Sequence, residues 1–160
     1  MNYIELFAGC GGLSLGLEAS GYNLVMANEL SPMASETFSY NFFNERLDGT
    51  GMPQHALWMN SNFPKAEINK RLRENPKTYP SIGEGGCSDI DENTELNKKL
   101  LVGSIVELNK LLESQPNLLS QIQDKGLPNG LDLVSGGPPC QSFSMAGLRQ
   151  LGNERNTLPW

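Results

Sequence analysis

The sequence is poor in residues that hold metal ions or disulfide frameworks. Its 160 residues include a single histidine and three widely spaced cysteines, Cys10, Cys87 and Cys140. An odd number of scattered cysteines indicates neither a set of disulfides nor a Cys-x-x-Cys zinc site. The pattern favours free thiols in a reducing compartment, so we expect a cytoplasmic protein without a bound metal. Cys10 is expected to pack as a small hydrophobe.

Long hydrophobic runs and an excess of positive charge are also missing. No apolar stretch approaches the roughly 20 residues of a membrane-spanning helix, and the residues from Met1 to Glu5 lack the basic start of a signal peptide. We therefore expect no membrane association. The net charge of −6 is unfavourable for binding nucleic acid over a broad surface, because such binding depends on Lys and Arg at phosphates. A nucleic-acid substrate would be held largely by residues outside this sequence.

The sequence does contain the opening of a nucleotide-binding fold. A short strand expected over residues 3–7 runs directly into the turn Ala8-Gly9-Cys10-Gly11-Gly12, and a helix is expected over residues 13–20. Glycines in such a turn permit positive φ angles and let a ligand approach the backbone closely. Taken alone, the turn fits a tight reversal in some other α/β protein equally well.

A second expected strand narrows the choice of ligand. It covers residues 22–28 and leads into Glu29, 20 residues after Gly9, where a carboxylate can accept both hydroxyls of a ribose. The pyrophosphate pattern Gly-x-Gly-x-x-Gly is out of register because Ser14 stands at its third glycine, and no Gly-Lys-Ser/Thr indicates a P-loop. A cofactor with adenosine but no phosphates suits this turn, and S-adenosylmethionine is the common one.

A cysteine near the end of the sequence stands on a rigid turn. The run Gly136-Gly137-Pro138-Pro139-Cys140-Gln141-Ser142-Phe143-Ser144 follows a strand expected over residues 131–135. A buried cysteine needs only volume, whereas glycines and prolines followed by polar residues fit a backbone that displays one side chain at a surface. We therefore interpret Cys140 as a nucleophile, and N–H groups of a helical turn expected over residues 141–146 would stabilise its thiolate.

These motifs together resemble the DNA cytosine methyltransferases that act on carbon 5. The resemblance rests on Glu5 to Leu13, on Asn28-Glu29, and on Gly137 to Ser144 followed by Arg155-Asn156-Thr157-Leu158, in the order found in the family. It implies an α/β fold of the Rossmann-like S-adenosylmethionine-dependent methyltransferase type. The sheet would be mostly parallel with helices on both faces, and the fold would be incomplete at the C-terminus.

The resemblance also implies roles for individual residues. Phe7 would stack on the adenine of S-adenosylmethionine, and Glu29 would hold its ribose. Further cofactor contacts are expected at Ala8, Gly9, Gly11, Gly12, Leu13, Leu30, Ser104, Ile105, Pro139 and Leu158. Cys140 would be the catalytic residue. Contacts to the DNA or the target base are expected at Gln141, Ser142, Ser144 and Arg155.

The chemistry implied by the resemblance explains the need for a cysteine. The thiolate of Cys140 would add to carbon 6 of a cytosine flipped out of the duplex, which makes carbon 5 able to attack the methyl group of the cofactor. Loss of the carbon 5 proton then expels the thiolate, and S-adenosylhomocysteine is the other product.

Two regions depart from the family pattern. The family motif Gly-Asp-Ile, whose aspartate receives the adenine amino group, is matched here by Gly103-Ser104-Ile105. A loop-rich insertion is expected at about residues 45–100, with one helix near residues 66–74. Beyond it, apolar residues at helical spacing predict helices that begin near Ile105 and Leu118.

The sequence ends inside the fifth motif of the family. We therefore expect residues 1–160 to form the N-terminal part of the cofactor-binding and catalytic domain, without the target recognition domain, and to be inactive alone. They would belong to a longer enzyme, or to a split enzyme completed by a second polypeptide, that modifies double-stranded DNA in a bacterial restriction-modification system. Two alternatives remain open: a non-catalytic half-domain that binds cofactor or a partner, and an RNA cytosine methyltransferase.

Overall fold

The fold is built on a parallel sheet. The structure is a computed structural model and describes residues 1–123, 127 and 130–139. Its five strands lie in the order β3-β4-β2-β1-β5, and all paired neighbours run parallel. The strands are β1 (Asn2–Leu6), β2 (Asn23–Glu29), β3 (Ala56–Trp58), β4 (Lys99–Val102) and β5 (Leu133–Gly136).

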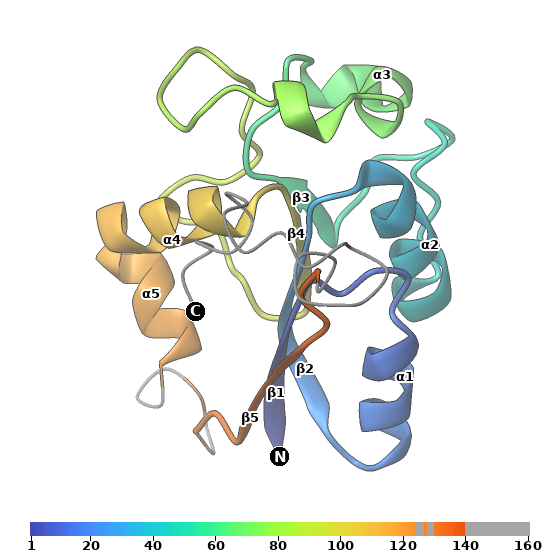
Figure 1. The fold of residues 1–160 in the computed structure, drawn as a ribbon, viewed down its shortest axis with the longest axis vertical. Coiled ribbons are helices and arrows are strands. Elements are labelled where there is room, and N and C mark those ends of the chain that lie inside the picture. Colours follow the sequence, from blue (N-terminus) through green and yellow to red (C-terminus); the bar gives the residue numbers. More distant parts are fainter. Residues whose placement is uncertain (124–126, 128–129, 140–160) are drawn as a thin grey trace, which may run out of the picture.

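Helices cover both faces of this sheet. Figure 1 shows α1 and α2 on one side and α4 and α5 on the other. The helices are α1 (Gly12–Ala19), α2 (Pro32–Phe43), α3 (Ile68–Leu72), α4 (Ile105–Ser114) and α5 (Pro116–Ile122), with 3-10 turns at Lys65–Glu67 and Pro76–Thr78. The expected α/β class, with a parallel sheet between two helical layers, is confirmed.

Two hydrophobic cores lie between these layers. Residues 24–27 of β2 are apolar and buried, as expected for a central parallel strand with both faces covered. Neighbouring residues of β1 point to opposite sides, so that Tyr3 packs with Phe38 of α2 while Ile4 packs with Leu108 of α4. Within the described residues, we find no helix that combines the length and the apolar character needed to cross a membrane.

The segment between α2 and β4 contains a strand that sequence analysis missed. Residues Ala56–Trp58 form the edge strand β3, which pairs with β4 and is fully buried. Three residues are too few to show the alternation that identifies a strand. The helix expected near residues 66–74 is present, because the turn Lys65–Glu67 continues directly into α3.

Buried polar groups hold this segment in place. The Arg71 guanidinium lies 2.6 Å from the Asp89 carboxylate, and both side chains are almost completely buried. Arg71 also donates to the carbonyl of Phe63, and Asp89 accepts the backbone N–H of Trp58. Nearby, the buried carboxylate of Glu74 accepts hydrogen bonds from Ser61 and Asn62. A loop-rich segment is thereby fixed to the edge of the sheet.

Candidate functional site

A cleft of about 370 Å³ opens where the central strands end. It is lined by Phe7, Gly9, Asn28, Glu29, Leu30, Ser104, Ile105, Gly137 and Pro139. These residues stand at the carboxyl ends of β1, β2, β4 and β5, where ligands bind in open parallel sheets. Seven of the residues expected to contact a cofactor are brought together here: Phe7, Gly9, Glu29, Leu30, Ser104, Ile105 and Pro139.

Phe7 has an unusual backbone conformation. Its φ angle is 56°, in the left-handed region that bulky residues rarely adopt. The next residue is tied to β2, because the Ala8 N–H donates to the Asn28 carbonyl at 2.9 Å. Strained residues held by well-ordered neighbours gather at ligand sites. The conformation turns the chain at the end of β1, where Phe7 lines the cleft.

Glu29 joins the glycine turn to the end of β2. Its Oε2 accepts the Gly9 N–H at 2.8 Å, and its Oε1 accepts the Ser31 N–H at 2.7 Å. A carboxylate oxygen can accept two hydrogen bonds, so each oxygen retains capacity for one more donor. The carboxylate is therefore fixed in orientation and can still accept the two hydroxyls of a ribose.

The glycines of the turn serve two purposes. Gly9 has a φ of 55°, and a Cβ built there meets no atom within 4 Å, so the missing side chain leaves space beside the cleft. At Gly11 a Cβ would lie 2.9 Å from the Phe38 ring, so packing against α2 also requires a glycine.

Four of the expected cofactor residues lie in or beside this turn but do not line the cleft: Ala8, Gly11, Gly12 and Leu13. Ala8 is buried, whereas Leu13 is 48% exposed. Cys10 was expected to pack in the protein, and this prediction was wrong, because its thiol is exposed. The turn projects Cys10 outward between two glycines with positive φ.

A buried carboxyl group beneath the turn was missed by sequence analysis. Glu5 is 2% exposed and accepts a hydrogen bond from the Ser14 hydroxyl of α1. Burial raises the pKa of Glu5, although the Ser14 hydroxyl opposes the shift. Ser14, which replaces the third glycine of a pyrophosphate fingerprint, thus ties the first turn of α1 to β1. The sequence feature that could have revealed this group is the position of Glu5, an acidic residue, inside an otherwise apolar strand.

Asn28 also has a role that its motif did not reveal. Its amide group donates to the carbonyls of Leu101 at 2.9 Å and Gly103 at 3.0 Å, which joins the ends of β2 and β4. Ser104, at the position expected for an aspartate, follows directly and caps α4 by accepting the Val106 N–H at 3.2 Å. A hydroxyl that accepts one hydrogen bond can also donate one, so Ser104 could donate to a ligand in the cleft.

The cleft has the groups needed to hold a flat base and a ribose. Phe7, Leu30, Ile105 and Pro139 supply apolar surface for a flat base, and Glu29 supplies acceptors for hydroxyls. None of the described residues that line the cleft is Lys or Arg, the usual partners of phosphate. Within the described part of the chain, no group of three His, Cys, Asp or Glu residues could hold a metal ion.

The remaining site predictions fall outside the described residues. They are Cys140, Gln141, Ser142, Ser144, Arg155 and Leu158. Pro139, the residue before Cys140 in the sequence, lies at the cleft. The chain direction therefore leads from the cofactor cleft toward the proposed nucleophile.

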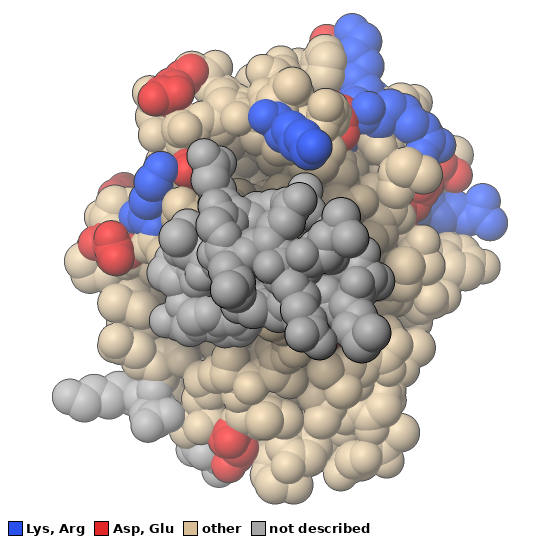
Figure 2. All heavy atoms as spheres, viewed as in Figure 1, with Lys and Arg blue, Asp and Glu red and all other residues tan. Residues whose placement is uncertain are grey.

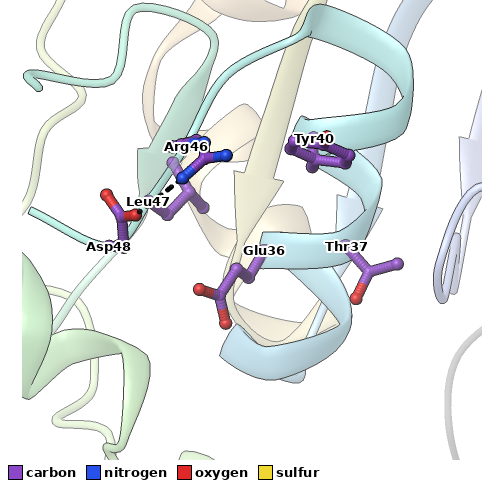
Figure 3. A pocket seen from close by; sticks show the side chains of 6 residues that line it. All are labelled: Glu36, Thr37, Tyr40, Arg46, Leu47 and Asp48. Carbon is purple, nitrogen blue, oxygen red and sulfur yellow. Dashed lines mark ion pairs between the residues drawn. The ribbon is translucent and has the colours of Figure 1, made fainter. Parts of the chain in front are cut away.

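A second hollow, of about 290 Å³, lies beside α2. Figure 3 shows its side chains, with Arg46 and Tyr40 above Glu36 and with Arg46 paired to Asp48 at 3.7 Å. It contains no residue of the sequence motifs. On the face drawn in Figure 2, the described Lys and Arg side chains lie mainly toward α3 and are mixed with Asp and Glu. This described surface does not form a continuous basic face for nucleic acid.

The parallel sheet with helices on both faces and a cleft at its strand ends has the α/β architecture of Rossmann-like folds. The sequence model of the C-5 cytosine-specific DNA methylase family matches residues 1–69 and 104–160. The chain belongs to this family. Residues 70–103 lie outside the match.

Curated relatives cover nearly the whole chain. The type II methyltransferase M.DdeI of Desulfomicrobium norvegicum is 27% identical over 99% of the chain, which corresponds to 23% of that protein. DNA (cytosine-5)-methyltransferase 3 of Arabidopsis thaliana is 31% identical over 88% of the chain and 8% of that protein. The chain thus spans a quarter or less of the length of these relatives. No solved structure matches the chain significantly.

Proposed function

We propose that this chain is the cofactor-binding and nucleophile-bearing part of a DNA cytosine-5 methyltransferase. One observation carries the proposal: residues from four distant segments, 7–9, 28–30, 104–105 and 137–139, converge on one cleft at the strand ends. Membership of the family and relatives named as DNA methyltransferases support the same activity.

In this proposal the cleft holds S-adenosylmethionine, which supplies the transferable methyl group when bound. Phe7 stacks on the adenine, and the carboxylate of Glu29 accepts the ribose hydroxyls. Ser104, Ile105, Leu30 and Pro139 complete the walls. The Gly9 backbone borders the cleft without a side chain and leaves room for the rest of the cofactor. Ala8, Gly11, Gly12, Leu13 and Leu158 are assigned to the same ligand on the basis of the sequence motifs.

Cys140 acts on the base. Its thiolate adds to carbon 6 of a flipped cytosine, and the extra electron pair makes carbon 5 nucleophilic. After methylation, loss of the carbon 5 proton restores the double bond and expels the thiolate. Gln141, Ser142, Ser144 and Arg155 are proposed to contact the DNA and the target base.

The rest of the activity is assigned to residues beyond these 160. The chain carries a net charge of −6 and spans 23% or less of the relatives described above, so DNA is expected to bind mainly elsewhere. We propose that residues 1–160 are the N-terminal part of a larger catalytic domain, with an insertion at about 45–100, and transfer no methyl group alone. A downstream region or a second polypeptide would complete a type II modification enzyme of the bacterial cytoplasm.

Binding of S-adenosylhomocysteine to the purified chain tests the cofactor site. Removing the ring by Phe7→Ala should weaken binding by about tenfold, because stacking of a base on an aromatic ring is worth about 1–3 kcal/mol. Glu29→Gln should also weaken binding, because one amide oxygen cannot replace both carboxylate oxygens. Tyr40→Ala removes an exposed ring from the hollow beside α2 and is the matched control.

Calorimetry would measure the dissociation constants, and circular dichroism would show that each variant is folded. Equal binding by the wild type, Phe7→Ala and Glu29→Gln would contradict the proposed site. For the chemistry, the complete protein should form a covalent adduct with DNA that contains 5-fluorocytosine, and Cys140→Ser should abolish it. If the adduct formed with RNA but not with DNA, the substrate would be RNA.

A further inference from the structure

A second cleft adjoins the cofactor cleft. Its volume is about 290 Å³, and it lies between the first turn of α4 and the chain segment Tyr79–Ile82, which we call the strap. Ser104 lines both clefts. The turn that carries Ser104 therefore separates the two clefts, and the contacts on each side of it bear on the position of Ser104.

One side of this turn is held by β2. The Gly103 N–H donates to the Glu29 carbonyl at 2.9 Å, and Asn28 donates to the Gly103 carbonyl. Gly103 has a φ of 151°, and a Cβ there would lie 2.7 Å from the end of Met59. These contacts fix the start of the turn, and beyond it the buried side chains of Ile105 and Leu108 anchor α4 in the hydrophobic core.

The other side is held by the strap. Asn60, which follows Met59 after β3, donates from its amide to the carbonyls of Pro80 at 3.0 Å and Ser81 at 2.8 Å. Glu107 of α4 accepts the N–H of Ile82 at 2.7 Å. The strap is thus anchored to the β3 side by Asn60 and to α4 by Glu107.

The position of Glu107 in its helix makes this contact informative. Ser104-Ile105-Val106-Glu107 has the Ser-x-x-Glu spacing of a capping box, in which the glutamate normally bonds back to the N–H of the capping serine. Here Ser104 does cap the helix, but Oε2 of Glu107 binds the strap and its Oε1 binds the Lys110 ammonium at 2.7 Å. Glu107 therefore stands at the capping-box position of α4 but binds the strap and not the N-terminus of its own helix.

We infer that Glu107 is a positioning residue for cofactor binding. By holding the strap against the first turn of α4, it sets Ser104 and Ile105 at the distance from Glu29 that the cofactor requires. The inference rests on the proposed function. The strap lies within residues 70–103, outside the two ranges that the family model matches.

Glu107→Ala in the full chain tests the inference. The dissociation constant for S-adenosylhomocysteine should rise about tenfold, the loss expected for one hydrogen bond to a charged group. In the complete enzyme, KM for S-adenosylmethionine should rise while kcat stays constant, because Glu107 touches neither cofactor nor base. Glu107→Gln keeps an acceptor for the Ile82 N–H and should restore most of the affinity.

Three controls separate positioning from a general effect. Glu113→Ala removes an exposed carboxylate from the same helix, and Lys110→Met removes only the other partner of Glu107; both should bind normally. Asn60→Ala releases the strap at its opposite end and should weaken binding as Glu107→Ala does. Because both variants free the same strap, the double variant should be little weaker than either single one.

Two outcomes would overturn the inference. Folded Glu107→Ala and Asn60→Ala variants that bind S-adenosylhomocysteine as tightly as the wild type would show that the strap has no role in the cleft. Additive losses in the double variant would show that the two residues act separately. If the wild type itself does not bind, the proposed function fails first and the inference fails with it.

Discussion

Two regions of the same sheet, its central strands and its edge beside β3, are stabilised in different ways. Residues 2–29, from β1 to the end of β2, combine a parallel backbone ladder with close packing at Gly11. Residues 56–98 have only a three-residue strand, and buried side-chain contacts such as Arg71 to Asp89 fix them instead. The first region is held mainly by backbone pairing between its strands, whereas the second depends on buried polar side chains.

The largest expected effect is on the second region. Arg71→Ala should lower the free energy of unfolding by about 3–5 kcal/mol, because it leaves the buried carboxylate of Asp89 without its cation. Urea denaturation followed by circular dichroism would measure the loss. Arg73→Ala, which removes an exposed arginine two residues away, should change stability by less than about 0.5 kcal/mol. Similar losses in both variants would remove the contrast between the regions.

In the first region the most sensitive position is expected at Gly11. Gly11→Ala forces a side chain into the left-handed region and places a methyl group 2.9 Å from the Phe38 ring. The expected loss is about 1–3 kcal/mol. Gly9→Ala has the same conformational cost but meets no atom within 4 Å, so it should be less destabilising. Thermal unfolding of the two variants compares the two glycines, and an equal loss would show that Phe38 moves aside.

Opposite pH dependences should distinguish the carboxyl group of Glu5, in the first region, from that of Glu107, which binds Ile82 of the second region. For Glu107, burial alone would raise the pKa, but the Ile82 N–H and the Lys110 ammonium outweigh burial and lower it from its usual 4.5. Its contribution to stability is present above pH 4.5 and is lost as the pH falls through the folded-state value. For Glu5, whose pKa is raised, the contribution is present below pH 4.5 and is lost as the pH rises through the folded-state value.

Denaturation at pH 3.5 and pH 7 measures both effects. Glu107→Gln should lower the free energy of unfolding by about 0.5–1.5 kcal/mol at pH 7 and by less at pH 3.5. Glu5→Gln should stabilise the protein more at pH 7 than at pH 3.5, since the variant carries no buried charge. If the stability of both variants changed with pH in the same way, the environments assigned to Glu5 and Glu107 would be refuted.

The smallest effect concerns Gly12. It is the first residue of α1, its φ is not in the left-handed region, and a Cβ there meets no atom within 4 Å. Gly12→Ala should therefore stabilise the helix by about 0.5 kcal/mol. If Gly12 contacts the cofactor as its motif predicts, the same variant should bind S-adenosylhomocysteine more weakly. A gain in stability with unchanged affinity would remove Gly12 from the site.

The sequence predicts the first region, residues 2–29, better than the second, residues 56–98. The strands at residues 3–7 and 22–28 were placed within one residue, because long apolar runs and a glycine turn identify them. Seven of the residues that line the cleft, including Phe7 and Glu29, were also predicted from the family resemblance, whereas Asn28 and Gly137 were not. The strand β3 was missed because three residues carry no period. The role of Glu107 was missed because its partner, Ile82, lies 25 residues away.

The sequence alone determined the α/β class, the order of motifs along the chain and the chemical type of each motif. These properties depend on local patterns of apolar residues, glycines and prolines. Only the tertiary structure decided that segments as distant as Gly9, Ser104 and Pro139 share one cleft, and that buried polar contacts hold the strap beside it. Burial makes such contacts specific, because a hydrogen-bonding group removed from water must find its partner wherever the fold brings one.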